Sequence, residues 1–273
     1  DNPATYWAHI DVDAVKRGFP MWGFPSNLRI EGDSSRILAQ LLEALRARAT
    51  PAFVAGARRR VAALAAEHRQ RMEGVARLAA DKGAPGRINP QYLCAELGRA
   101  IAPDDIVLNE AIRNGPAVFS QVPRSKPGTL IGLAGGGLGF SGGMALGMKL
   151  AQPGRTVLQI VGDGSFYFCN PEAVYAVAAQ YRLPIFTVVL DNGGWAAVKE
   201  ATLRMHPEGE AKRLGAYASQ LAQGMAFAKI GEAAGAYGET LTEPAEAAAA
   251  IRRCLDEVRG GRSAVLHVHI GPH

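Results

Sequence analysis

The pattern of apolar positions along the chain predicts strands and helices in alternation over residues 88–273. Continuous apolar runs predict strands at 106–109, 156–161, 185–190 and 264–270. Segments with helical spacing lie between and around them, at 90–101, 142–151, 171–181, 226–234 and 244–258. Continuous apolar strands joined by helices are typical of a parallel sheet covered on both faces. The sequence therefore predicts an α/β fold here.

The first 87 residues have a different pattern. Short apolar strands are expected at 7–12 and 28–30, and an amphipathic helix follows them. This amounts to about one βαβ unit, which is too small to stand alone as a parallel sheet. We therefore interpret residues 1–50 as the tail of an α/β domain whose front is expected outside the given sequence. The Ala- and Arg-rich segment 51–87 has helical spacing and ends in a glycine- and proline-containing turn, so we predict a connecting helix and a linker.

The charge distribution raises a question about nucleic acid. The 273 residues carry a net charge of +5, and between positions 45 and 78 eight arginines face two glutamates. A basic stretch can bind nucleic acid, but this one lacks a series of interleaved aromatic side chains that could stack on bases. We interpret it as a solvated helix surface and expect no nucleic-acid partner.

Composition also indicates the cellular compartment of the protein. No apolar run approaches the length of about 20 residues that a membrane helix needs, so we expect no membrane partner. The given sequence shows no basic-then-apolar leader, so we do not expect a secreted protein. The cysteines, Cys94, Cys169 and Cys254, lie too far apart for a disulfide framework or a CxxC metal site. A cytoplasmic protein fits this usage of cysteine.

Polar residues gather where two neighbouring strands end. Gly162-Asp163-Gly164-Ser165 follows one apolar run, and Asp191-Asn192-Gly193-Gly194 follows the next. A right-handed crossover places such strands side by side, so Asp163 and Asn192 should meet. Their oxygens suit Mg²⁺ or Ca²⁺, which would keep open positions for a diphosphate and water. A lone GDG is also a common turn, but the paired strand ends favour a site.

A second glycine-rich segment leaves an alternative open. Residues 137–142 fit GxGxxG, and Asp163 follows at the spacing of a ribose-binding acid, as in an NAD-binding Rossmann domain. The segment before it, 126–129, is a poor strand, and this interpretation leaves residues 191–194 unexplained. We therefore favour the metal and diphosphate site.

The two strand-end motifs together resemble the signature of thiamine-diphosphate enzymes, a GDG that is followed by NN after a helix and a strand. Residues 136–140 and the earlier Leu108-Asn109-Glu110 are similar to the acetolactate synthase and benzoylformate decarboxylase group. The resemblance covers most of residues 88–273, and residues 1–50 resemble the end of the central α/β domain of that group. It implies the diphosphate- and Mg²⁺-binding domain of a lyase or transferase that cleaves or forms a carbon–carbon bond next to a 2-oxo group. Carboligation of the acetolactate synthase type and 2-oxo-acid decarboxylation are the leading reactions.

The resemblance also implies roles for individual residues. Asp163, the side chain of Asn192 and the backbone carbonyl of Gly194 would bind Mg²⁺, and Leu138 would support the bent cofactor. The cofactor-binding residues would be Ile112, Arg113, Gly136, Gly137, Leu138, Gly162, Asp163, Gly164, Ser165, Asn192, Gly193, Gly194 and Trp195. One position departs from the family pattern, because Asp191 stands where an asparagine is usual.

The resemblance places the remaining machinery elsewhere. In the family, the glutamate that activates the cofactor comes from a pyrimidine-binding domain, usually of a neighbouring subunit in a homodimer or homotetramer. We find no such domain in this sequence, so we expect that glutamate outside the chain and do not assign its role to Glu110. A non-catalytic accessory half-chain remains an alternative, and so does FAD as a further cofactor. His267 and His269 alternate on the last predicted strand, and we interpret them as structural.

Overall fold

The chain forms two compact units, Asp1–Gln70 and Arg71–His273, in a computed structural model. The structure describes residues 4–16, 18–19, 25–132, 137–222 and 224–271. The boundary between the units falls inside one long helix, α2 (Pro51–Ala80). Our division at residues 50 and 87 stays a prediction.

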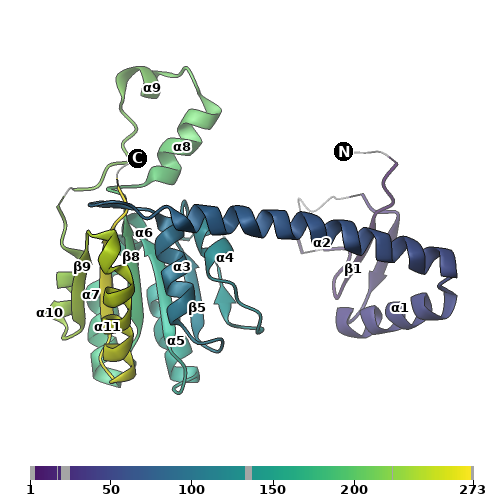
Figure 1. Cartoon of the computed structure of the whole chain (residues 1–273), viewed down its shortest axis with the longest axis horizontal. Coiled ribbons are helices and arrows are strands. Elements are labelled where there is room, and N and C mark those ends of the chain that lie inside the picture. The colour runs from purple at the N-terminus through teal and green to yellow at the C-terminus, as the bar shows by residue number, and fades with distance from the viewer. Residues whose placement is uncertain (1–3, 17, 20–24, 133–136, 223, 272–273) are drawn as a thin grey trace. The chain divides into compact units, whose positions relative to one another are not determined.

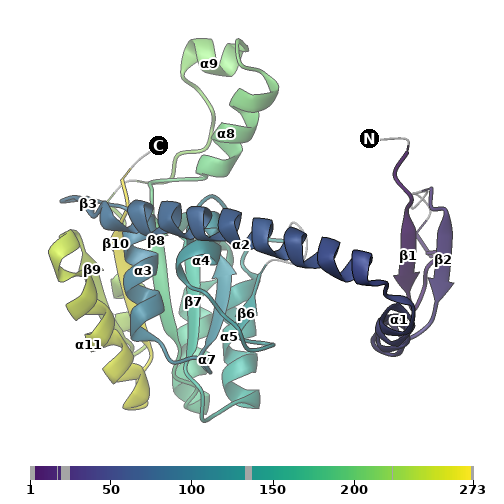
Figure 2. The ribbon, with the colours of Figure 1, turned by 45° about the vertical axis from the view of Figure 1, so that its right-hand side comes forward.

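The first unit is a small α/β fragment. Strands β1 (Ala8–Asp11) and β2 (Leu28–Glu31) pair in parallel, and α1 (Ser34–Arg48) follows (Figure 2). The helix begins where it does because the Asp33 side chain accepts a hydrogen bond from the Ser35 N–H at 2.9 Å, which satisfies a free donor of the first turn. No residue of α1 is buried, and among the described residues of this unit only Ala14 is. The unit therefore has almost no core of its own.

Helix α2 carries six of the eight arginines of the basic stretch, and these six are exposed. In the segment predicted as a linker, residues 83–88 form a short hairpin of β3 (Gly83–Ala84) and β4 (Arg87–Ile88). Gly83 has φ +81°, and a Cβ there would lie 2.2 Å from the Arg87 carbonyl oxygen. Only glycine fits this close turn. No helix in the described part of the chain is long and apolar enough to cross a membrane.

The second unit contains a six-stranded parallel sheet (Figure 1). Its strands are β5 (Ile106–Glu110), β6 (Leu130–Ile131), β7 (Val157–Gly162), β8 (Phe186–Asp191), β9 (Tyr237–Leu241) and β10 (Ala264–His269). Their order is β6-β5-β7-β8-β10-β9. The predicted α/β class is confirmed, and β7 and β8 are neighbours as expected, with Gly162 opposite Leu190.

Helices cover both faces of this sheet (Figure 2). One face packs against α3 (Pro90–Ala100), α4 (Gly115–Gln121) and α11 (Ala247–Arg259), and the other against α5 (Phe140–Ala151), α7 (Pro171–Tyr181) and α10 (Phe227–Ala233). Successive strand residues point to opposite faces, so Leu158 and Ile160 enter the first core while Val157 and Val161 enter the second. Because both faces are buried, the strands are continuously apolar.

Three further helices lie after β7 and β8 in the sequence. They are α6 (Asp163–Phe168), α8 (Ala196–Met205) and α9 (Glu210–Leu214). The helix predicted at 244–258 begins with a 3-10 turn, Pro244–Glu246, before α11. The sheet thus presents the loops after β5, β7 and β8 along one edge, here called the carboxyl edge.

Candidate functional site

The strand order places a topological switch at the carboxyl edge. From β5 the chain moves outward to β6, whereas β7 lies on the other side of β5. Loops that leave neighbouring strands in opposite directions open a crevice between them, and ligands of open α/β sheets bind in such crevices. Here the crevice lies between residues 111–114 after β5 and Asp163 after β7, with Asn192 after β8 beside it.

A cavity of about 480 Å³ occupies this place. The predicted site residues that line it are Ile112, Arg113, Leu138, Gly162, Asp163, Gly164, Ser165, Asn192, Gly194 and Trp195. Gly193 lines a neighbouring pocket of about 310 Å³, and Gly137 lines neither. Gly136 lies outside the described residues. Residues that are far apart in the sequence thus meet around one cavity.

The wall that the sequence pattern missed belongs to α8. Ala197, Val198, Ala201 and Thr202 line the same cavity, and all four come from this one helix. Arg113 forms an ion pair with Glu200, which joins the loop after β5 to α8. The helical spacing of the apolar residues in 196–205 is the signal that could have found this wall.

Asp163 is the most unusual side chain of the cavity. It is 2% exposed, it opens the first turn of α6, and its Oδ2 has no hydrogen-bond partner among the described residues. Burial, and then the charge of nearby Asp191, raise its pKa to about 7. A cation at the free oxygen would supply the missing compensation.

Asp191 is held by contacts that the pattern did not predict. Its Oδ1 accepts the Gly193 N–H at 2.9 Å, and its Oδ2 lies 2.8 Å from His267 Nε2. Burial alone would raise its pKa, but the hydrogen bonds from His267 and Gly193 outweigh burial and leave the pKa below its ordinary value. His267 also packs edge-on against the Phe227 ring at 5.0 Å. Asp191 therefore ties the loop after β8 to β10.

Glycines let backbone and rings approach closely around the cavity. A Cβ on Gly164 would lie 2.3 Å from Trp195 Cδ1, and a Cβ on Gly194 would lie 2.2 Å from the Ser219 carbonyl oxygen. Gly193 has φ +80°, which suits glycine. The Asn192 Oδ1 accepts the Gly194 N–H at 3.2 Å, so the loop bends back on itself. Such a loop offers its amide groups to an anion.

The donors and acceptors of the cavity fit a cation with an anion. Asp163 Oδ2 is a buried acceptor and Trp195 Nε1 a buried donor, and neither has a partner in the part of the chain that the structure describes. A carboxylate, an amide oxygen and a peptide carbonyl are the oxygen ligands that Mg²⁺ takes in proteins. Glu110, by contrast, does not line the cavity. One of its carboxylate oxygens accepts a hydrogen bond from Gly139, and the other accepts hydrogen bonds from Ser141.

Comparison with known proteins indicates the same enzyme family as the sequence motifs. Residues 116–268, more than half of the chain, match the family described as thiamine pyrophosphate enzyme, C-terminal TPP binding domain. Benzoylformate decarboxylase of Pseudomonas aeruginosa is 40% identical over 101 residues, which cover 37% of this chain and 19% of that protein. The large subunit of acetolactate synthase isozyme 3 of Escherichia coli is 28% identical over 185 residues, which cover 67% and 31%.

Solved structures share the fold. A thiamine-diphosphate-dependent 4-hydroxybenzoylformate decarboxylase of Rhodococcus jostii superposes with a TM-score of 0.58 at 25% identity, over 70% of this chain and 33% of that one. Benzoylformate decarboxylase of Polynucleobacter necessarius gives a TM-score of 0.55 at 20% identity, over 68% of this chain and 33% of that one. The chain spans about a third or less of the length of these relatives.

Proposed function

Since this chain belongs to the thiamine pyrophosphate enzymes, we propose that its unit Arg71–His273 binds thiamine diphosphate with Mg²⁺ in the cavity at the carboxyl edge. The observation that carries the proposal is the buried Asp163 carboxylate, whose Oδ2 has no hydrogen-bond partner among the residues that the structure describes and whose pKa is raised to about 7 by burial and by Asp191. Such a group is costly in an isolated fold and is stabilised by a bound cation.

We assign the metal to three oxygen donors. Asp163 supplies a carboxylate oxygen from the start of α6, Asn192 its side-chain oxygen, and Gly194 its backbone carbonyl. The Asn192 oxygen already accepts the Gly194 N–H, but a carbonyl oxygen has two lone pairs and can still bind a cation. Mg²⁺ prefers six ligands, so diphosphate oxygens and water would complete its shell.

The rest of the cavity would hold the remainder of the cofactor. The diphosphate would meet the glycine-rich backbone around Gly162, Gly164, Ser165 and Gly193 and the indole N–H of Trp195. The rings would rest on Leu138, with Gly136 and Gly137 preceding it and with Ile112 and Arg113 across the cavity. When bound, thiamine diphosphate supplies a nucleophilic carbon and an electron sink for cleaving the bond next to a carbonyl.

The reaction class follows from the relatives and from the lining. We propose decarboxylation of a 2-oxo acid, or its carboligation, because the similar proteins are named as decarboxylases and acetolactate synthases. Among the described lining residues, Arg113 is the only cationic side chain, so it would face a substrate carboxylate. Ile112, Val198 and Ala201 would meet an apolar substituent.

Complete activity would need more than this chain. We propose that the activating glutamate comes from a pyrimidine-binding domain, in the same longer polypeptide or in a partner chain of an oligomer. In support, the chain spans about a third or less of its relatives, and Glu110 is engaged elsewhere. The purified 273-residue chain should therefore bind the cofactor without turning over 2-oxo acids.

Titration calorimetry tests the binding. Thiamine diphosphate should bind in the presence of Mg²⁺, and binding should be lost in Asp163→Ala. Asp256→Ala, an exposed carboxylate on α11, is the matched control and should bind normally. Binding of NAD in place of thiamine diphosphate, or cofactor binding that survives Asp163→Ala, would overturn the proposal. Turnover by the chain alone would overturn only the need for a second domain.

A further inference from the structure

We propose that Glu110 is a positioning residue that holds Leu138 in place to receive the rings of the cofactor. The inference rests on the proposed function and deepens it. It concerns residues 137–139, here called the Leu138 loop, which lie directly before α5. Leu138 lines the cavity, whereas Glu110 does not, so Glu110 can act on the cofactor only through this loop.

The carboxylate of Glu110 is surrounded by donors from the loop and from the first turn of α5. Its Oε1 accepts the Gly139 N–H, and its Oε2 accepts the Ser141 N–H at 3.0 Å together with the Ser141 hydroxyl. Glu110 is 0% exposed. Three donors suit an acceptor-only carboxylate, and an anion is favoured at a helix N-terminus, where amides are free and the dipole is positive.

The Ser141 hydroxyl that donates to Glu110 also belongs to a buried chain of hydrogen bonds across the sheet. Gln159 Nε2 of β7 donates to the Ser141 hydroxyl oxygen at 2.7 Å, and Thr187 Oγ1 of β8 donates to Gln159 Oε1 at 2.9 Å. Each of these side chains is at most 1% exposed. Donor and acceptor roles agree along this chain of hydrogen bonds, which links α5 to β7 and β8, whereas Glu110 is held directly by Gly139 and Ser141.

The loop meets a second wall on its other side. Gly139 has φ +90°, and a Cβ there would lie 2.4 Å from the Phe168 carbonyl oxygen at the end of α6. The Leu138 loop therefore lies between the Glu110 carboxylate and the last residue of the helix that Asp163 begins. Losing the carboxylate would release one wall of this loop while leaving Asp163 and the loop after β8 in place.

This geometry separates two parts of the cofactor. Inorganic diphosphate with Mg²⁺ would use only the residues after β7 and β8, whereas thiamine diphosphate would also use Leu138. In Glu110→Gln, the amide turns a donor toward the donors of the loop, which is unfavourable for a buried group. We expect thiamine diphosphate to bind about tenfold more weakly, which is 1.4 kcal/mol, and diphosphate to keep its affinity within about twofold.

The experiment is calorimetry of both probes, with Mg²⁺, on the wild-type chain, Glu110→Gln and Thr187→Val. Thr187→Val is the matched control, because it breaks the far end of the same buried chain without touching the loop. It should lower the unfolding midpoint in urea and leave both affinities unchanged. A structural role alone would make both variants alike, and equal losses for both probes in Glu110→Gln, or no loss, would overturn the proposal.

Amide exchange on the wild-type chain keeps the proposal testable if Glu110→Gln does not fold. Without cofactor, the amides of Gly139 and Ser141 should exchange nearly as slowly as those of β7, since both donate to Glu110. Fast exchange at both amides would contradict the proposal. If the wild-type chain binds no thiamine diphosphate at all, the proposed function fails instead, which is a different result.

Discussion

At the scale of single residues, two acids at the carboxyl edge have pKa values that are shifted in opposite directions. Burial and the charge of Asp191 raise the pKa of Asp163 to about 7, while His267 and Gly193 hold the pKa of Asp191 below its ordinary value despite burial. Asp191 is thus compensated within the protein, whereas one oxygen of Asp163 has no hydrogen-bond partner in the described part of the chain. The acid that lacks internal compensation is the one that we propose as the metal ligand.

The contact between His267 and Asp191 gives a prediction at this scale. His267→Ala should lower the free energy of unfolding by about 3 kcal/mol, because it leaves a cavity beside Phe227 and the half-buried carboxylate of Asp191 without its partner. Urea denaturation measures the loss. His267→Gln retains a donor for Asp191 and should lose less. Equal losses in the two variants would show that packing alone matters.

Part of the site could be predicted at the residue scale. Glycines flank Asp163 and follow Asn192 directly, so local sequence shows a polar strand end that backbone amides can surround. His267 could not be assigned to Asp191, because 76 residues separate them and only the pairing of β10 with β8 brings them together. The donors to Glu110 were unpredictable for the same reason.

At the scale of elements, α5 contains a matched pair of glycines. A Cβ on Gly142 would lie 2.9 Å from Val174 Cγ2, whereas a Cβ on Gly143 meets nothing within 4 Å. Gly142→Ala should therefore destabilise the fold by about 1–3 kcal/mol through overpacking. Gly143→Ala should stabilise it by about 0.5–1 kcal/mol, because alanine loses less conformational entropy in a helix. Urea denaturation measures the change in stability of both variants. If both were destabilised, or both stabilised, the result would contradict the packing of α5 on α7.

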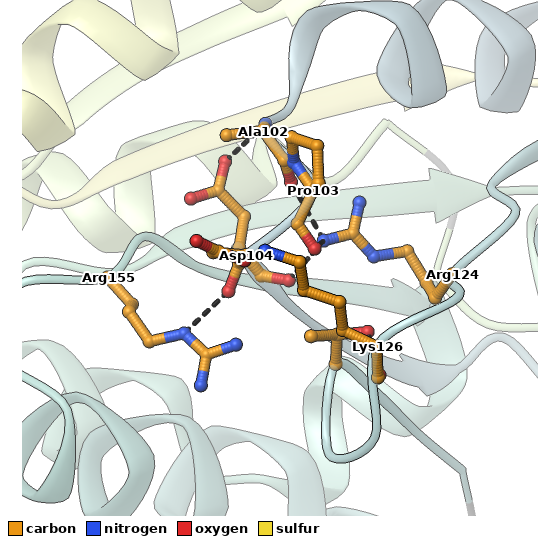
Figure 3. A network of polar contacts seen from close by, with 8 residues as sticks. Ala102, Pro103, Asp104, Arg124, Lys126 and Arg155 are labelled. Atoms are coloured by element: carbon orange, nitrogen blue, oxygen red, sulfur yellow. Dashed lines mark hydrogen bonds and ion pairs between the residues drawn. The ribbon is translucent and has the colours of Figure 1, made fainter.

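The opposite edge of the sheet has its own polar network (Figure 3). Arg124 donates to the carbonyl oxygens of Ala102 and Pro103, both at 2.8 Å, and Arg155 Nε donates to the Asp104 carbonyl oxygen at 2.6 Å. Lys126 pairs with the Asp104 carboxylate. These contacts hold the turn that leads into β5.

Removing the Arg124 donors should therefore affect stability without affecting the site. Arg124→Ala should lower the free energy of unfolding by about 1–2 kcal/mol, because water replaces only part of these hydrogen bonds. Thiamine diphosphate affinity should stay unchanged in calorimetry. A loss of affinity in Arg124→Ala at unchanged stability would show that the start of β5 influences its carboxyl end.

The strands that are buried on both faces of the sheet were the ones that the sequence predicted best. Strands β7, β8 and β10 are buried on both faces, and their apolar runs identified them from sequence. Strand β6 has two residues, and β9 is a half-exposed edge strand that contains Gly238 and Glu239, so neither forms such a run. The start of α5 at Phe140 was missed because it depends on the distant Glu110 carboxylate.

At the scale of the whole molecule, the two units differ in how much they bury. The core clusters lie in Arg71–His273, and the last part of α2 packs there through Ala79 and through the hydrogen bond from Gln121 Nε2 to the Val75 carbonyl oxygen at 2.8 Å. In the first unit, α1 leaves Leu38, Leu41, Leu42 and Leu45 exposed. The second unit therefore has what an independent fold needs, and the first does not.

Separate expression of the two units tests this difference. A chain of residues 71–273 should fold and bind Mg²⁺ and thiamine diphosphate with an affinity within about twofold of the 273-residue chain. A chain of residues 1–70 should lack a cooperative unfolding transition by circular dichroism. Cofactor binding that needs residues 1–70 would contradict the placement of the site in the second unit alone.

The order of the strands also has a consequence for folding in the cell. The cavity forms only when the ends of β5, β7 and β8 and the Leu138 loop have come together. A partly folded chain therefore lacks the binding site for the cofactor. Such long-range pairing forms slowly and late. A ligand that binds only the finished sheet shifts the balance toward it by mass action. Vitamin supply would then govern how much of this protein persists, as well as how much of it is charged with cofactor.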